Sequence, residues 1–245
     1  MTTVKIATVA LADNPMPATT PSSAELSLLR ASPWFAGCDG ALQQALLALG
    51  RRQLLGDGRA LFERGGQAEG LCCVLEGALR VGALHDDGGA SLLAWLEPGQ
   101  WFGEISLLDG LPRTHDAVAD GPTSVWLVPH AELSAWLEQH PQHWRDLARL
   151  ACAKLRLAFE VLEDIAQLPL PARLAKRLLL VARGYGTGAL RRQVRLPQEQ
   201  LALMLGVSRQ SLSKALHALA DQGLVALRYG EIELLDAAAL QALGR

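Results

Sequence analysis

Short apolar segments separated by glycine-containing turns, between residues 51 and 128, constrain the fold of this chain more than any other feature. Each segment has the length of a β-strand, and none has the long apolar stripe that a helix would need. This part of the chain is therefore predicted to be a sandwich or jelly roll. The segments are 71–75, 78–83, 91–96 and 123–128, and the turns lie at 65–66, 77, 86–89 and 98–99. We interpret turn 86–89 as a hairpin tip.

Helical periodicity returns after Pro129, and Pro141 begins a helix that is predicted to reach about Leu168. At 1.5 Å per residue, this helix would be roughly 40 Å long. A helix with two apolar stripes needs two partners, most simply its own β-roll and the same helix of a second subunit. Burial of both stripes within one monomer is the alternative. One stripe contains Ala151, Leu155, Ala158, Leu162 and Ile165, and the other contains Leu147, Leu150, Leu157 and Val161.

The N-terminal region combines a tail with two predicted helices. Residues 1–21 are rich in Thr, Ala and Pro, so a mobile tail is expected. Ser22 and Glu25 have the spacing of a capping box and start a short helix that ends near Ser32. A second helix is predicted over residues 39–50.

The C-terminal region has the spacing of a helix-turn-helix. Prolines at 169 and 171 break the long helix, residues 172–183 form the next one, and 184–186 form a turn. Within residues 196–216, Ala202 is small where two helices would cross, and Gly206 permits the tight turn. The apolar residues that pack the second helix inward are Val207, Leu212 and Leu216.

The outward face of that second helix carries the side chains expected to contact DNA. Ser208 can cap the helix, and polar residues near its N-terminus occupy the positions from which side chains enter the major groove. They are Arg209, Gln210, Ser211 and Lys214. Residues 224–234 read as two short strands of a wing.

Charge is divided unequally along the chain. Residues 1–168 carry a net charge of -8 and residues 169–245 carry +6. A basic C-terminal region favours binding to a polyanion such as double-stranded DNA, although a basic face is often only a solvated one.

Residues 98–114 resemble the phosphate-binding cassette of cyclic-nucleotide-binding domains, and the chain from about residue 25 resembles the Crp/Fnr superfamily of bacterial regulators. The resemblance implies that a cyclic phosphate binds the amides of a short helix after Gly103, beside Arg113 and Thr114. It also implies that Glu104 binds the ribose hydroxyl. An ion pair between Glu104 and Arg113 that only holds the roll together is the alternative. The implied effector site also includes Phe102, Ile105, Ser106, Ala158 and Phe159.

Two departures from the family pattern concern the effector. Members that bind cyclic AMP use hydroxyl side chains of the long helix to contact adenine, whereas the equivalent positions here are Ala158 and Phe159. His115 replaces a small residue, either as a core histidine or as a contact to a different ligand. Cyclic AMP, cyclic GMP and cyclic di-GMP all remain candidate effectors, and no cofactor is expected.

The sequence thus predicts an α+β chain with a jelly-roll sensor domain and a winged helix-turn-helix. The predicted divisions are the tail 1–21, the sensor domain 22–140, a dimerisation helix 141–168 and the DNA-binding domain 169–245. The expected partners are DNA, a second copy of the chain, a nucleotide effector and RNA polymerase. An effector-independent regulator with a vestigial pocket is one alternative. A regulatory subunit that acts on a protein partner is another.

Other classes find no support in the sequence. No coherent catalytic, metal-binding or P-loop arrangement is visible, so we expect neither an enzyme nor a metal site. The four cysteines, Cys38, Cys72, Cys73 and Cys152, are interpreted as small buried apolar residues. No apolar run approaches the roughly 20 residues that span a membrane, and the N-terminus lacks a signal peptide. A cytoplasmic protein is expected.

Overall fold

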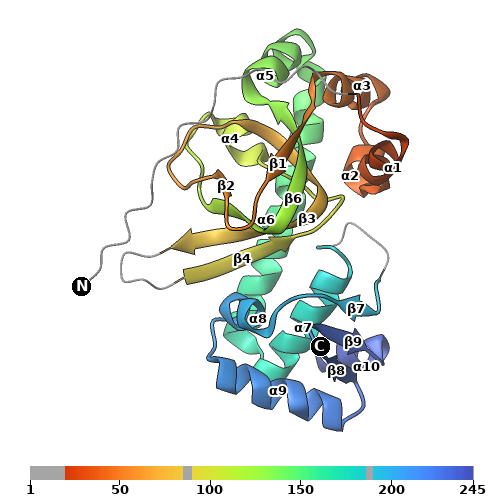
Figure 1. Cartoon of the computed structure of the whole chain (residues 1–245), viewed down its shortest axis with the longest axis vertical. Helices are drawn as coiled ribbons and strands as arrows, with labels where there is room; N and C mark the ends of the chain where they lie inside the picture. The colour runs from red at the N-terminus through yellow and green to blue at the C-terminus, as the bar shows by residue number, and fades with distance from the viewer. Residues whose placement is uncertain (1–19, 85–89, 186–189, 245) are drawn as a thin grey trace, which may run out of the picture.

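The computed structural model describes residues 20–84, 90–185 and 190–244 (Figure 1). A β-roll with N-terminal helices forms one end of the molecule, and a helical domain with a small sheet forms the other. The long helix α6, Trp144–Gln167, runs past the roll to the C-terminal domain. Tail residues 1–19, the predicted hairpin tip 86–89 and Gly186 lie outside the described residues.

From residue 20 on, three short helices precede the roll. Helix α1, Ser23–Ala31, begins with the predicted capping box, in which the Glu25 amide donates to Ser22 Oγ over 3.3 Å. Pro33 does not simply end this helix, because proline fits the first turn of a separate helix, α2, Pro33–Ala36. The Asp39 side chain caps α3, Gly40–Leu49, so the helix predicted over residues 39–50 is confirmed.

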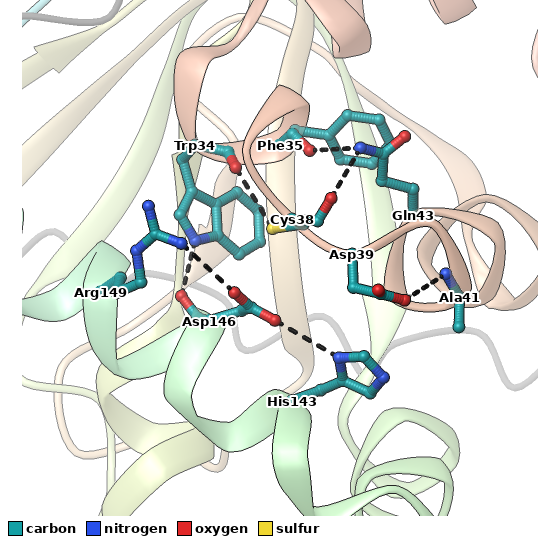
Figure 2. A network of polar contacts seen from close by, with 9 residues as sticks. All are labelled: Trp34, Phe35, Cys38, Asp39, Ala41, Gln43, His143, Asp146 and Arg149. Atoms are coloured by element: carbon teal, nitrogen blue, oxygen red, sulfur yellow. Dashed lines mark hydrogen bonds and ion pairs between the residues drawn. The ribbon is translucent and has the colours of Figure 1, made fainter.

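A polar network fastens these helices to the start of α6 (Figure 2). The Trp34 indole donates to the carbonyl oxygen of Asp146 over 2.7 Å. The Asp146 carboxylate lies 3.3 Å from His143 Nδ1 and 3.6 Å from the Arg149 guanidinium. The N-terminal end of α6 is therefore joined to α2 through Trp34.

The roll is built from antiparallel strands in the order β1-β6-β3-β4, with β2 beside β6 and β5 beside β3. Its interior is apolar and contains Phe62, Val74, Leu79 and Phe102. The predicted β-roll is confirmed. The strands are β1, Arg51–Leu55; β2, Ala60–Phe62; β3, Gly70–Leu84; β4, Ala90–Leu96; β5, Trp101–Phe102; and β6, Asp116–Pro129.

Gly77 was wrongly interpreted as a turn between two strands. Segments 71–75 and 78–83 belong to the single strand β3, and the pairing with β6 shifts register around Gly77. Gly77 has φ 76°, and an added Cβ would lie 2.5 Å from the Pro122 carbonyl oxygen. Glycine therefore makes a β-bulge, which bends the strand without ending it.

Helices α4, Glu104–Asp109, and α5, His130–Gln139, follow β5 and β6. Pro141 begins a 3-10 turn, Pro141–His143, and α6 continues from it as predicted.

The two halves of α6 have different surroundings. In the first half, Leu147 and Leu150 are buried against the roll. The stripe that contains Leu155, Leu162 and Ile165 is exposed, because each of these three side chains keeps more than half of its surface in solvent. Burial of both stripes within one monomer is therefore wrong.

In its described residues, the C-terminal domain packs four helices and a three-stranded sheet around one core. The two wing strands are present as predicted, whereas β7 and α10 were not predicted. The elements are α7, Leu170–Ala182; β7, Gln193–Val194; α8, Gln198–Leu205; α9, Arg209–Asp221; β8, Val225–Arg228; β9, Glu231–Leu234; and α10, Ala237–Leu243.

The C-terminal domain also contacts the roll. Trp95 of β4 is buried in the same apolar cluster as the core of this domain. Its backbone amide donates to the Tyr185 hydroxyl oxygen over 2.8 Å, and Arg191 forms an ion pair with Glu97. Burial raises the pKa of Tyr185 to about 12. The phenol therefore stays neutral and accepts this bond at physiological pH.

The cysteines do not all behave as predicted. Cys38, Cys72 and Cys73 are buried, but Cys152 is exposed. The roll covers one face of α6, but Cys152 lies on an uncovered face of this helix. Among the described residues, none of the helices combines the length and the apolarity that a membrane crossing requires.

Candidate functional site

The cassette begins where β5 turns into α4. Gly103 precedes the first residue of α4 with φ 95°, a backbone conformation that favours glycine. A Cβ on Gly103 would lie 2.7 Å from the Gly70 carbonyl oxygen and 3.0 Å from Arg113 Nη1. Glycine thus allows the chain to pass close to Arg113.

Arg113 is buried and held by backbone as well as side-chain groups. Nη1 donates to the Gly103 carbonyl over 3.1 Å, and Nη2 donates to the Gly70 carbonyl over 2.8 Å. Nε donates to the Glu69 carboxylate over 3.2 Å, and the guanidinium lies 4.1 Å from the centre of the Phe62 ring. Three of the five guanidinium N–H groups are thereby used. The side chain has a fixed position, and with respect to the described residues two of its N–H groups are left to donate.

Glu104 is also buried, but its partner is Lys154 of α6, whose ammonium donates to the carboxylate over 2.7 Å. The alternative ion pair between Glu104 and Arg113 is therefore wrong. Arg113 is directed to the start of β3, where it meets Gly70 and the preceding residue Glu69. Helix α4 packs against α6, which brings Glu104 to Lys154.

Sequence reasoning missed Lys154 and Glu69. Lys154 was detectable as a cation within the apolar periodicity of α6, four residues after Leu150. No local signal pointed to Glu69, which precedes β3 and lies 44 residues before Arg113 in the chain.

The other predicted cassette residues divide into buried and exposed ones. Phe102 and Ser106 are buried, whereas Ile105 and Thr114 are exposed. Thr114 Oγ1 lies 2.9 Å from His115 Nδ1. Burial and the nearby Arg64 lower the pKa of His115. His115 is only partly buried and lies at the edge of the cassette, so it is not a core residue.

Ala158 and Phe159 lie on the exposed part of α6, in the same segment as Leu155 and Leu162. Within the single chain their side chains are mainly in solvent.

The buried thiols near the cassette are not reactive groups. Burial raises the pKa of Cys72 to about 12, although Arg113 acts in the opposite direction. A thiol with such a pKa remains protonated at physiological pH and is a poor nucleophile. In the part of the chain that the structure describes, no group of three His, Cys, Asp or Glu side chains could hold a metal ion.

The second candidate site is the helix-turn-helix. Helices α8 and α9 meet at Gly206, which has φ 64°, and Ala202 is buried between them. Ser208 caps α9, accepting a hydrogen bond of 3.1 Å from the Ser211 amide. Leu212 and Leu216 are fully buried, so the predicted inward face is confirmed.

The predicted outward face of α9 is fully accessible. Arg209, Gln210, Ser211 and Lys214 are all exposed. Arg209 forms an ion pair with Glu199, a residue of α8 that sequence reasoning did not single out. Both partners are exposed, so this pair is weak and a competing phosphate or base can replace it.

Comparisons with known proteins agree with both domains. A family model of the cyclic nucleotide-binding domain matches residues 52–140, and a model of the Crp-like helix-turn-helix domain matches residues 172–243. The cyclic AMP receptor protein of Thermus thermophilus is 32% identical over 215 residues, which cover 88% of this chain and 98% of that protein. The chain belongs to the Crp/Fnr family of transcription regulators.

Other members of the family have the same organisation. The CRP-like cAMP-activated global transcriptional regulator of Mycobacterium tuberculosis is 30% identical over 191 residues, which cover 77% of this chain and 85% of that protein. The structure of FixK2 from Bradyrhizobium japonicum superimposes with a TM-score of 0.72 and 25% identity, covering 80% of this chain and 98% of that one. This Crp/Fnr regulator therefore combines the α+β sensor fold with a DNA-binding domain, as the sequence predicts.

Proposed function

We propose that this Crp/Fnr regulator is gated by a cyclic nucleotide that binds Arg113, Thr114 and Glu104. The observation that carries the proposal is the guanidinium of Arg113, which the Gly103 and Gly70 carbonyls and Glu69 hold beside the start of α4. Two of its N–H groups have no partner in the part of the chain that the structure describes. A rigid guanidinium beside helix amides matches the charge and shape of a phosphate. The Glu104 carboxylate has lone pairs beyond the one that Lys154 uses, so it can also accept from a ribose hydroxyl.

The identity of the nucleotide depends on Ala158 and Phe159. Neither side chain offers a hydrogen bond to a base, but the exposed Phe159 ring offers a surface for stacking. We therefore include cyclic AMP, cyclic GMP and cyclic di-GMP as candidates. The relatives from Mycobacterium tuberculosis and Thermus thermophilus are named for cyclic AMP, which makes it the first to test.

The functional unit in this proposal is a homodimer joined through α6. Leu155, Phe159, Leu162 and Ile165 are each more than half exposed on that helix. A continuous apolar stripe of this kind is characteristic of a helix that packs against a second copy. An effector that contacts the stripe near Phe159 would then change the packing between the α6 helices of the two subunits. This change would in turn alter the orientation of the two DNA-binding domains.

The dimer would bind a palindromic operator. Two copies of α9 would lie in successive major grooves, about 34 to 36 Å apart. Arg209 would read guanine through its O6 and N7 acceptors, and Gln210 would read adenine. Ser208, Ser211 and Lys214 would support binding, RNA polymerase would be the protein partner, and the chain would work in the cytoplasm without catalysing a reaction.

Calorimetric titration tests the effector. The wild-type protein is titrated with cyclic AMP, cyclic GMP and cyclic di-GMP, and the Arg113→Ala variant is titrated in parallel. A charge-assisted hydrogen bond contributes about 1.5 to 3 kcal/mol, so the substitution should weaken binding at least about tenfold. Binding of none of the three nucleotides, or equal binding to both proteins, would contradict the proposal.

One observation favours a second candidate, an effector-independent regulator. Glu104 and Arg113 already have protein partners in Lys154 and Glu69. A pocket whose charges are paired internally needs no ligand for its stability. Gel shifts with operator DNA distinguish the two functions, because DNA affinity that no nucleotide alters would favour the effector-independent regulator.

A further inference from the structure

A cleft of about 490 Å³ lies between α6, α7, the end of α8 and the C-terminal residues after α10. Its volume is in the range of small-molecule sites, which is roughly 300 to 1,000 Å³. It lies in the second half of α6, whereas α4 and its cassette pack on the same helix near Lys154. The effector site proposed above does not include it.

Among the charged side chains on the wall of this cleft, basic ones outnumber acidic ones. The cations are Arg156, Arg173, Lys176, Arg177 and Arg183. The acidic side chains are only Glu160 and Asp164. Asp164 forms an ion pair with Lys176, so this carboxylate is already neutralised. The wall therefore keeps an excess of positive charge.

Two of these arginines lack the partners that buried cations require. Arg177 is only 8% exposed, and among the described residues no hydrogen bond or ion pair joins its side chain. Tyr185 and Asp164 influence it only through longer-range electrostatics, and burial lowers its pKa. Arg173 Nε is buried without a hydrogen-bond partner. Arg177 is not among the described side chains with a buried unpaired nitrogen, so its guanidinium nitrogens reach the solvent of the cleft. A cation with no protein partner at the wall of a cleft attracts an anion, so an anion between the two side chains would stabilise the site.

Most of the other side chains on the wall are apolar. They include Leu157 and Val161 of α6, Leu180 of α7 and Met204 of α8. A ligand that matches both parts has a multiply charged anionic end and a flat apolar end. A nucleotide that carries a polyphosphate has this combination, whereas a simple inorganic anion would use only the arginines.

We propose that this cleft is a second ligand site, specific for a nucleoside polyphosphate. Arg173 and Arg177 bind the phosphate groups, and the apolar wall formed by Leu157, Val161 and Met204 packs against the base. The site joins α6 to the DNA-binding domain, because its walls come from α6 on one side and from α7 and α8 on the other.

Calorimetry with ATP and with inorganic pyrophosphate tests the site. Both should bind the wild-type chain, ATP more tightly, because only ATP can cover the apolar wall. Arg173→Gln should weaken both by at least about tenfold. Arg177→Gln should act in the same way, but Arg173 is the less buried of the two and is the safer substitution for folding. Arg145→Gln changes an exposed arginine of α6 that does not line the cleft, and it should leave binding unchanged.

An Arg113→Lys variant separates this site from the cassette. ATP binding that Arg113→Lys abolishes and Arg173→Gln leaves intact would assign the nucleotide to the cassette and overturn the second site. Absence of ATP and pyrophosphate binding, or equal binding to the wild type and Arg173→Gln, would overturn it as well. None of these results depends on whether a cyclic nucleotide binds, so the two proposals can fail separately.

Discussion

The two candidate recognition sites of this regulator differ in how firmly their side chains are held in the absence of a ligand. The Arg113 side chain in the cassette is 3% exposed and is fixed by two carbonyls and Glu69. The Arg209 side chain on α9 is 72% exposed, and among the described residues its one ion-pair partner is the exposed Glu199. One arginine belongs to the core of its domain, and the other lies on a surface.

This difference determines whether a substitution in a site changes the stability of the fold as well as ligand binding. A rigid, buried site loses little conformational entropy when a ligand binds, but its residues also hold the fold together. Side chains on an open surface contribute nothing to the core. Substitutions in the cassette should therefore change both folding and binding, whereas substitutions on α9 should change binding alone.

The largest effect should come from the helix that connects the two sites. Leu155→Lys combined with Leu162→Lys removes two buried leucines per subunit from the proposed seam, each worth about 1.5 to 3 kcal/mol. Sedimentation should show monomers, and DNA binding should be greatly weakened, while each monomer remains folded. Glu163→Lys, a charge change at an exposed position of α6 outside the apolar stripe, is the control. A wild-type protein that is monomeric at micromolar concentration would contradict the seam.

Arg113→Ala should have the next largest effect, now on the fold itself. It leaves the Gly103 and Gly70 carbonyls without their donor and Glu69 without its cation. Breaking a buried pair costs about 3 to 5 kcal/mol, and the partial exposure of Glu69 favours the lower end. Urea unfolding measures the loss, with Arg113→Lys as the charge-conserving control. An unchanged unfolding midpoint would mean that the cassette is not part of the core.

Arg209→Ala should reduce the affinity for operator DNA by roughly 1 to 3 kcal/mol and relax selectivity at one base pair. Its free energy of unfolding should stay within about 0.5 kcal/mol of the wild type, because the side chain is exposed. Quantitative gel shifts on operator variants and urea unfolding measure the two quantities. A large loss of stability in this variant would contradict the view that Arg209, unlike Arg113, contributes to binding and not to folding.

Gln210→Glu should change which base is preferred and leave most of the affinity in place. A carboxylate accepts a hydrogen bond from cytosine, whereas an amide both donates to and accepts from adenine. Selection of binding sites from a random duplex library compares the two proteins. The same consensus for both would show that Gln210 does not read a base directly.

The smallest effect concerns His115 and pH. Burial and Arg64 lower the pKa of His115 in the folded chain, so the unfolded chain binds its proton more tightly. His115 should therefore contribute stability above its ordinary pKa of 6.5, and this contribution should be lost as the pH falls through the lower folded value. Urea unfolding near neutral pH and near pH 5 should show a smaller change for His115→Asn than for the wild type. Identical changes would indicate that other groups dominate.

The helix-turn-helix was predictable nearly residue by residue because its signals are local. Ser208 caps a helix that starts at the next residue, Gly206 has the left-handed conformation that the turn needs, and Leu212 and Leu216 follow the helical period. The turn from β5 into α4 was predictable for the same reason, since Gly103 is required by its own backbone conformation.

The partners of buried charges were not predictable. Glu104 bonds to Lys154 and not to Arg113, and Arg113 bonds to Glu69, which lies 44 residues earlier in the chain. Such pairs depend on which elements pack together. Arg113 is much nearer to Glu104 in the sequence than Lys154 is, yet the distant lysine forms the bond because α4 packs against α6. Cys152 was misplaced because α6 has both covered and uncovered faces.

The sequence by itself therefore determined the order of the elements, the two domains and the family to which the chain belongs, because periodicity, caps and glycine conformations act over a few residues. Only the tertiary structure decided how β3 continues through Gly77, which half of α6 is covered and how Arg173 and Arg177 come to line one cleft. These features arise where segments distant in the chain pack against each other. The free energy of that packing depends on contacts between distant segments, so it cannot be derived from any single stretch of sequence.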